Sequence, residues 1–214
     1  MQNTAASTDY YAAARNDILP YVPSAARTVL EIGCGFGHFG LALKQRQSCE
    51  VWGIEMVPKA AAEAETRLDK VFCGDAMSCW EQLPDQYFEV LVMNDVLEHM
   101  VDPYVFLRKI KTKLKPNATL IASIPNIRYI RTLFDLVVAR DFRYTNDGVM
   151  DRTHLRFFTR MSMQRMFQDE GYRIEKMDGN HPSRHPLAWL LTLVSFGWMR
   201  DCLYMHYTVL ARPD

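Results

Sequence analysis

The segment 29–40, which reads VLEIGCGFGHFG, constrains the fold of this chain more than any other feature. Its residues VLEI, apolar except for Glu31, form a strand pattern that runs directly into Gly33, Gly35 and Gly37. Glycine adopts positive φ readily and lets the backbone approach a ligand closely. A strand that opens through such a turn into a helix is typical of an α/β sheet that holds its ligand over the carboxyl ends of the strands.

Strand and helix patterns alternate along the rest of the chain. Short apolar strands are predicted at 28–32, 50–55, 70–73, 88–93, 119–124, 172–177 and 203–211. Helices are predicted at 37–45, 59–68, 104–114, 127–139 and 159–171, the last of them capped by Thr159. This alternation predicts a doubly wound α/β fold, in which a mostly parallel sheet carries helices on both faces.

The 214 residues fit a single domain. We assign 1–27 to an N-terminal helical lid and 28–214 to the domain itself, with acceptor-side insertions at about 126–158 and 178–201. The second insertion contains the apolar run 186–199, which is too short to cross a bilayer. We interpret this run as a buried or partner-facing helix, with a homodimer as one alternative. Its few cationic residues argue against a membrane contact.

Composition argues against several classes of protein. The 25 basic and 25 acidic residues balance, whereas nucleic-acid binders usually carry a basic excess. Five cysteines without a CxxC pair do not suggest a disulfide framework or a structural zinc site. The N-terminus lacks the pattern of a signal peptide. We therefore expect a cytoplasmic protein whose partner is a small-molecule acceptor.

Polar residues end the predicted strands in a regular order. Glu55 ends the second strand, Asp75 and Ala76 follow the third, and Asn94 and Asp95 end the fourth. Each acid alone is compatible with a solvated turn. A nicotinamide dehydrogenase also places an acid after its second strand, but its glycine pattern is GxGxxG rather than the ExGxGxG found here.

With these features, residues 10–177 resemble the class I S-adenosylmethionine (SAM)-dependent methyltransferase family. The resemblance implies a Rossmann-like seven-stranded sheet with an antiparallel last strand, and SAM as cofactor. It implies cofactor contacts from the following residues: Glu31, Gly33, Gly35, Gly37, Glu55, Asp75, Ala76, Asn94 and Tyr11. In this family the acid after the second strand holds the ribose hydroxyls, the acid after the third reads the adenine, and Tyr10 or Tyr11 would close over the cofactor.

Two further motifs are candidates for the acceptor site: DVLEH at 95–99 and DRTHLRFFTR at 151–160. Helical spacing would place Asp95, Glu98 and His99 on one face, with His154 in a loop that crosses above the sheet. Asp95, His99 and His154 are then candidate catalytic residues, with a histidine as general base. Together with Glu98 they could instead hold a divalent metal such as Mg or Mn. A third interpretation is that they only brace the helix and the loop.

Similar paired motifs occur in the quinone-biosynthesis O-methyltransferases and in the small-RNA 2′-O-methyltransferases, where two acids and two histidines hold a metal. This chain has Asp95 where the RNA enzymes have Glu. The DRTHLRFFT string looks most like bacterial methyltransferases found among cell-surface glycan enzymes. We therefore expect methyl transfer from SAM to a hydroxyl of a sugar or phenol-type metabolite. The alternatives are a catalytically silent SAM-binding partner subunit and RNA 2′-O-methylation.

Arginines are frequent in the crossing region between 126 and 158. They alternate with aspartates there, so we expect most of these arginines to form salt bridges with them.

Overall fold

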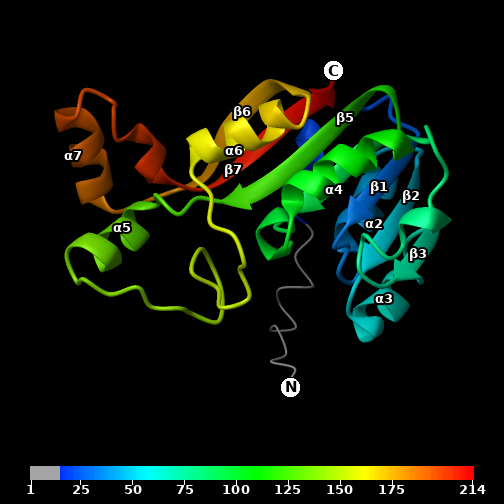
Figure 1. Ribbon diagram of the computed structural model, residues 1–214, viewed down its shortest axis with the longest axis horizontal. Helices are drawn as coiled ribbons and strands as arrows, with labels where there is room; N and C mark the ends of the chain where they lie inside the picture. The colour runs from blue at the N-terminus through cyan, green and yellow to red at the C-terminus, as the bar shows by residue number, and fades with distance from the viewer. Residues whose placement is uncertain (1–14) are drawn as a thin grey trace.

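A computed structural model describes residues 15–214, and a single mixed sheet runs through them (Figure 1). Its strands are β1 Thr28–Ile32, β2 Glu50–Glu55, β3 Lys70–Cys73, β4 Phe88–Asn94, β5 Leu114–Pro125, β6 Tyr172–Pro182 and β7 Tyr204–Pro213. They lie in the order β3-β2-β1-β4-β5-β7-β6. The first five strands pair in parallel, and β7 is antiparallel to both β5 and β6. The predicted fold class is confirmed.

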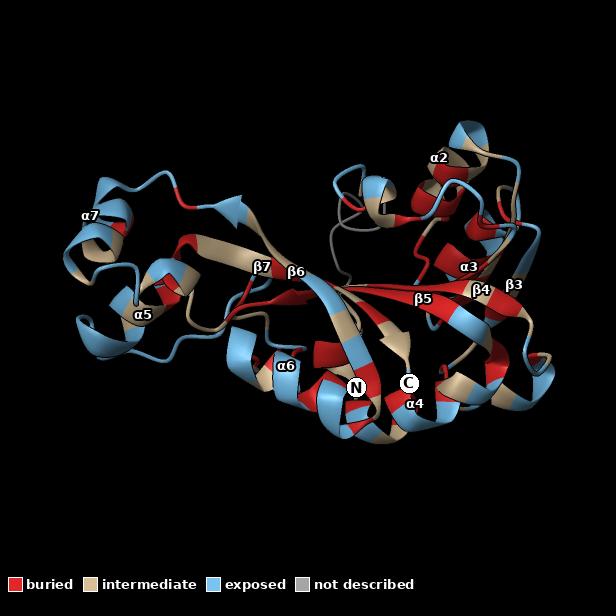
Figure 2. Cartoon of the chain, turned by 90° about the horizontal axis from the view of Figure 1, so that it is seen from above, coloured by how far each residue is buried: buried red, intermediate tan, exposed pale blue. Residues whose placement is uncertain are grey.

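Helices flank the sheet on two sides (Figure 2). They are α2 His38–Arg46, α3 Pro58–Ala64, α4 Pro103–Ile110, α5 Ile130–Val137, α6 Arg160–Asp169 and α7 Pro186–Val194. Short 3-10 turns lie at η1 Leu19–Tyr21, η2 Trp80–Gln82, η3 Leu97–His99, η4 Lys111–Lys113 and η5 Arg200–Leu203. The order in which strands are added to the sheet reverses between β1 and β4, which are parallel, so the carboxyl ends of these two strands open a crevice where α/β proteins place their ligands.

Alternating side chains of the strands fill two apolar cores. Leu30 of β1 and Leu91 of β4 face the core beneath α4 and α6, whereas Val29 and Val92 face the core beneath α2 and η1. This period of two is the side-chain geometry of a strand, and burial on both faces explains why these strands read as continuous apolar runs. The result is a rigid platform whose strand ends present the site.

Several boundaries differ from the prediction. Strands β5 and β6 are longer than expected. Strand β5 begins earlier, where Leu114 pairs with Phe88 of β4, and β6 continues to Pro182 because β7 pairs with it along its length. In the described part of the predicted helical lid, the only helical element is the turn η1. Pro20 and Pro23 lack the amide hydrogens that a longer helix would need. Ile18 and Val22 instead pack into the core beneath α2.

Helices α5 and α7 project beyond the carboxyl end of β5 (Figures 1 and 2). A small core that contains Ile130, Ala188 and Leu203 joins them to each other and to the start of β7. Within the described residues, no helix is both long enough and apolar enough to cross a membrane.

Candidate functional site

The glycine turn after β1 has the backbone that its sequence predicts. Gly33, Gly35 and Gly37 have φ of +69°, +54° and +78°, a region that side chains with a Cβ rarely adopt. A Cβ at Gly33 would also lie 2.8 Å from Cγ2 of Val96, which follows β4. The turn therefore needs glycine both for its conformation and for its approach to the end of β4.

Glu55 ties the end of β2 to this turn. One of its carboxylate oxygens accepts the N–H of Gly35 and the other accepts the N–H of Val57, each at 2.9 Å. The side chain is buried. Glu55 thus holds the glycine turn in place, a role that the sequence analysis did not assign to it.

Buried polar atoms without partners lie near the carboxyl ends of β1 and β4. They are Oε2 of Glu31 and both side-chain polar atoms of Asn94. Burial raises the pKa of Glu31 to about 8. Such atoms are rare in folded proteins, since leaving them unpaired is unfavourable. They therefore mark a place where a polar ligand would complete the hydrogen bonding.

The predicted adenine contacts lie at the end of β3. Oδ1 of Asp75 accepts the N–H of Met77 at 2.8 Å, and the side chain is exposed. Ala76 is buried. The amide of Gly74 donates to the carbonyl of Glu55 at 2.9 Å, which holds this turn beside the end of β2. Tyr10 and Tyr11 lie outside the described residues.

Asp95 adopts a left-handed conformation, with φ of +55°. Its carboxylate accepts hydrogen bonds from Arg15 and, at 3.3 Å, from the hydroxyl of Ser123, and it lies 3.5 Å from Nε2 of His206. Arg15 also donates to the Ser123 hydroxyl at 2.9 Å. The segment before η1 therefore crosses the carboxyl ends of β4 and β5.

Arg15, Ser123 and His206 were not predicted as site residues from the sequence. Ser123 stands near the carboxyl end of a predicted parallel strand, and that position was a usable signal. Arg15 and His206 carried no such signal, because they reach Asp95 only through the path of the N-terminal segment and through the insertion of β7 next to β5.

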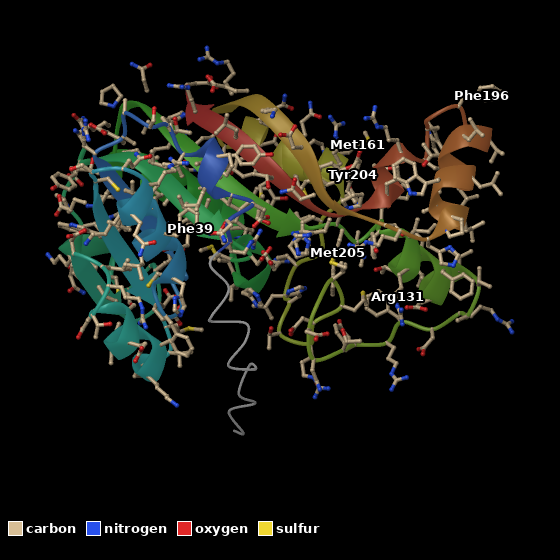
Figure 3. The ribbon with its side chains drawn as sticks, turned by 180° about the vertical axis from the view of Figure 1, so that it is seen from behind. Phe39, Arg131, Met161, Phe196, Tyr204 and Met205 are labelled. Carbon is tan, nitrogen blue, oxygen red and sulfur yellow. The ribbon has the colours of Figure 1, made fainter. Side chains whose placement is uncertain are left out.

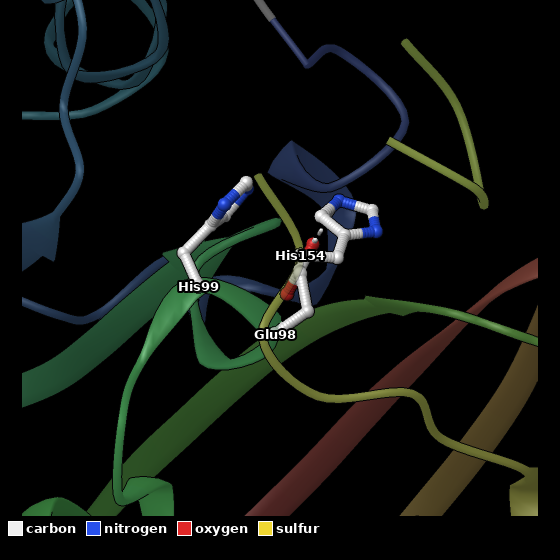
Figure 4. A group of neighbouring side chains, drawn as sticks. All are labelled: Glu98, His99 and His154. Atoms are coloured by element: carbon white, nitrogen blue, oxygen red, sulfur yellow. Dashed lines mark ion pairs between the residues drawn. The ribbon is translucent and has the colours of Figure 1, made fainter. Parts of the chain in front are cut away.

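The two acceptor-side motifs meet in space (Figure 4). One ligand atom from each of Glu98, His99 and His154 can be chosen so that all three lie within 4.8 Å of one another. Oε1 of Glu98 is 3.9 Å from Nε2 of His154, and the centroids of the two imidazole rings are 4.8 Å apart. We call these three residues the Glu–His–His cluster.

Asp95 does not belong to this cluster. The predicted helical face that would join Asp95 to Glu98 and His99 does not form, because only the 3-10 turn η3 follows β4. The left-handed backbone of Asp95 comes before that turn, and its side chain reaches Arg15 instead.

Backbone bonds fix the cluster on both sides. The N–H groups of Leu155 and Arg156 donate to the carbonyl of Glu98 at 2.8 and 3.0 Å, which joins the crossing loop to η3. Nδ1 of His99 is 3.2 Å from the carbonyl of Thr153, and Nδ1 of His154 is 3.1 Å from the carbonyl of Val149. Each carbonyl favours a proton on Nδ1 and so leaves Nε2 as the basic nitrogen.

The environment of the cluster disfavours charge. Glu98 is 1% exposed and neither of its carboxylate oxygens has a partner. Burial, reinforced by the negative charge of Asp95, raises its pKa well above the ordinary value. Burial, and next the neighbouring His99, lower the pKa of His154. The two imidazoles beside a carboxyl group without a hydrogen-bond partner can accept a proton or bind a cation.

The arginines of the crossing region do not pair with its aspartates as predicted. Arg128 binds Asp201, with Nε 2.6 Å from Oδ2, rather than an aspartate of its own region. Arg156 donates to the carbonyl of Val101. The salt-bridge prediction is wrong: among the described residues, no arginine of the crossing region forms an ion pair with an aspartate of that region, and η5 brings Asp201 to Arg128 instead.

A sheet of this order, with a glycine turn after β1 and an acid after β2, defines a Rossmann-like nucleoside-cofactor fold of the methyltransferase kind. The family described as "Methyltransferase domain" matches residues 5–177. The chain therefore belongs to the class I SAM-dependent methyltransferase family.

Known relatives are similar over part of their length. A ubiquinone biosynthesis O-methyltransferase of Aeromonas salmonicida is 28% identical over 165 residues, which cover 72% of this chain and 66% of the relative. One from Bradyrhizobium diazoefficiens is 33% identical over 101 residues, 46% of this chain and 40% of the relative. The chain thus spans less than two thirds of these relatives.

A solved structure extends the likeness over nearly the whole chain. The SAM-dependent methyltransferase from Archaeoglobus fulgidus has a TM-score of 0.69 at 20% identity, with 96% of this chain and 94% of that chain covered. At this identity the likeness concerns the fold.

Proposed function

We propose that this chain transfers the methyl group of SAM to a hydroxyl oxygen of a small acceptor of the phenol or sugar type. The observation that carries the proposal is the Glu–His–His cluster just beyond β4, where Val96 packs on Gly33 of the cofactor turn. A hydroxyl nucleophile needs a proton acceptor beside it, and an imidazole is suited to this at neutral pH. The relatives named as O-methyltransferases support oxygen as the acceptor atom.

The chain's own residues fit the proposed cofactor. SAM supplies an electrophilic methyl group together with an amino-acid end and an adenosine. The unpartnered buried atoms of Glu31 and Asn94 suit the polar amino-acid end. Glu55 can accept the ribose hydroxyls and keep its two backbone bonds, because each carboxylate oxygen has two acceptor sites. We assign Asp75 and Ala76, which follow β3, to the adenine.

Within the cluster we assign the base to His99. Its ring is only half-buried, so an acceptor can reach it, whereas His154 is buried. With the proton of His99 held on Nδ1 toward Thr153, Nε2 can take the hydroxyl proton as the oxygen attacks the methyl carbon. His154 and Glu98 then position His99 and exclude water from one side of it.

A bound Mg or Mn ion is the second candidate for activating the hydroxyl. Glu98, His99 and His154 would hold it, and the two carboxylate oxygens of Glu98, which have no hydrogen-bond partner, are ligands that suit such an ion. The ion would lower the pKa of the hydroxyl. The direct-base assignment has priority, because Asp95, the predicted fourth ligand, is engaged by Arg15.

The test is methyl transfer from methyl-labelled SAM to a panel of catechol-type phenols and free sugars, with the product identified by NMR. His99→Ala should lower kcat by about 10²- to 10⁴-fold and leave the affinity for S-adenosylhomocysteine (SAH) unchanged. His185→Asn, which preserves the N-cap of α7 and lies outside the cluster, is the matched control. Full activity of His99→Ala would contradict the assignment. If turnover required a divalent metal ion, activation of the hydroxyl would be assigned to that ion rather than to His99.

Two other outcomes decide between the remaining functions. SAH binding without turnover on any acceptor, RNA included, would indicate a silent SAM-binding subunit. Turnover on RNA alone would identify an RNA 2′-O-methyltransferase. A product methylated on nitrogen would refute the hydroxyl proposal.

A further inference from the structure

Helices α5 and α7 and the chain next to them form a projecting lobe, which we define as residues 129–144 and 183–200. The lobe lies beyond the end of the sheet, away from α2, α3 and α4 (Figures 1 and 2). A small core, with Ile130, Ala188 and Leu203 at its centre, attaches it to the start of β7, and the rings of Phe142 and Tyr144 contact Phe157 of the crossing loop. Most of its surface therefore faces outward.

The outward surface of the lobe is strongly apolar. Phe196 is fully exposed, and Trp198, Leu193 and Val137 are 78%, 74% and 70% exposed. Further exposed apolar residues of the lobe are Phe134, Leu136, Val138, Phe142, Tyr144, Leu187, Trp189, Leu190 and Val194. Among the described residues, most of the exposed large apolar side chains lie here. A concentration of this kind marks a surface that binds something else.

The charge of the lobe indicates what it binds. It contains five arginines and no lysine, against only Asp135 and Asp141, whereas the whole chain has a net charge of zero. The arginines are Arg131, Arg140, Arg143, Arg184 and Arg200. Segment 186–199 alone contained too few cations for a membrane contact. The fold places α5 beside it, and the chain that follows α5 and flanks α7 adds Arg140, Arg143, Arg184 and Arg200.

We propose that this lobe docks the protein on the surface of an anionic phospholipid bilayer. Aromatic and aliphatic side chains at the tip would enter the headgroup region, and the arginines would pair with lipid phosphates. The nine residues of α7 rise about 14 Å, which suits a helix that lies in the interface. A second copy of the chain is a poorer occupant, because the arginines of two lobes would face each other.

Docking would bring the proposed acceptor site to the membrane. The crossing loop that carries His154 follows α5 directly, and α5 itself follows the end of β5. The lobe and the Glu–His–His cluster therefore lie at the same, carboxyl, end of the sheet (Figure 1). An acceptor held at the lipid surface would approach the cluster from that side.

The test is co-sedimentation of the full chain with vesicles of phosphatidylcholine alone and of phosphatidylcholine with about one third phosphatidylglycerol. We expect binding to the anionic vesicles, weaker at high salt. The double variant Leu193→Ser/Phe196→Ser should bind at least about tenfold more weakly. Met161→Ser is the matched control: it is 67% exposed, it lies on α6 outside the lobe, and it should bind like the wild type (Figure 3).

The arginines are tested in the same assay. Arg140→Gln/Arg143→Gln should weaken binding to anionic vesicles by about tenfold or more, since each arginine near the surface contributes about 1 kcal/mol, or about fivefold. Arg173→Gln, an exposed arginine on β6, should leave binding unchanged. Circular dichroism and thermal unfolding of every variant check that the fold is intact.

Three results would overturn the proposal. The first is the absence of binding to anionic vesicles, and the second is equal binding by the Leu193→Ser/Phe196→Ser variant. The third is that the protein forms a dimer without lipid, that the same two substitutions dissociate this dimer, and that the protein does not bind vesicles. The last result would make the lobe a subunit interface. SAH binding and turnover on a water-soluble acceptor should be the same in this variant, so failure of the docking proposal is distinguishable from failure of the proposed function.

Discussion

The carboxyl group of Glu31 is buried, and one of its oxygens has no hydrogen-bond partner. Because burial disfavours the charged form, ionisation of Glu31 lowers the stability of the folded chain. Its pKa rises from 4.5 when solvated to about 8 when folded. Between these values the folded chain binds more protons than the unfolded chain, so the free energy of unfolding should fall as the pH rises from 4.5 to about 8. Urea unfolding of the wild type and of Glu31→Gln across this range measures the effect.

The Gln variant should remove this part of the pH dependence and leave other contributions unchanged. Equal slopes in the wild type and the variant would contradict the account of Glu31. If SAM binds here, its ammonium should favour the carboxylate, so SAH binding near pH 7 should release protons, measurable by calorimetry in buffers of different ionisation enthalpy.

The two histidines of the cluster should respond differently to substitution. His154 is buried and bonded to the carbonyl of Val149, so His154→Ala should lower the free energy of unfolding by about 1–3 kcal/mol. His99 is half-buried, so His99→Ala should affect stability much less and turnover much more. Denaturant unfolding and kcat measured on the same two proteins give the comparison, and equal stability losses would argue that His99 is structural.

Prediction from sequence succeeds at this scale where a residue follows a strand directly. The glycine turn and Glu55 lie where their spacing places them, because the carboxyl ends of parallel strands align. Asp95 shows the limit. Its left-handed backbone and its pairing with Arg15 depend on a segment whose path no local pattern specifies.

The glycine turn is the element whose conformation matters most. Gly33→Ala should lower the free energy of unfolding by roughly 1–3 kcal/mol, from strain at φ +69° and from the clash with Val96. Gly148→Ala is a matched control, because its φ is +74° but a Cβ there meets nothing within 4 Å. Chemical denaturation should show the larger loss at Gly33. Equal losses would mean that the clash with Val96 does not contribute to the loss of stability in Gly33→Ala.

Elements that depend on local signals were predictable. Thr159 does cap α6, with its hydroxyl accepting the N–H of Ser162 at 3.2 Å. The helix expected at 127–139 is shorter, Ile130–Val137, and begins after Asn126 pairs with Met205 and with Phe158. These partners are distant in sequence, so periodicity alone could not place the start of the helix.

At the scale of the whole molecule, the N-terminal segment ties together the two halves of the sheet. Arg15 binds Asp95 after β4, and the hydroxyl of Tyr21 donates to Asp178 of β6 at 2.6 Å. Arg15→Met and Asp95→Asn should each destabilise the fold by roughly 1–3 kcal/mol, since each removes a hydrogen bond between two charged and largely buried groups.

The double variant should lose less than the sum of the two single losses, with a coupling of about 0.5–3 kcal/mol. Thermal unfolding of the four proteins gives the cycle. Strict additivity would show that the contact between Arg15 and Asp95 does not stabilise the fold.

The most direct test of the account is calorimetric titration of the full chain with SAH. We predict one site with a Kd in the micromolar range, about −8 kcal/mol, and much weaker binding by Gly33→Val. Absence of binding by both SAH and SAM, with binding of a nicotinamide dinucleotide in their place, would contradict the assignment of the glycine turn, Glu55 and Asn94 to a SAM site.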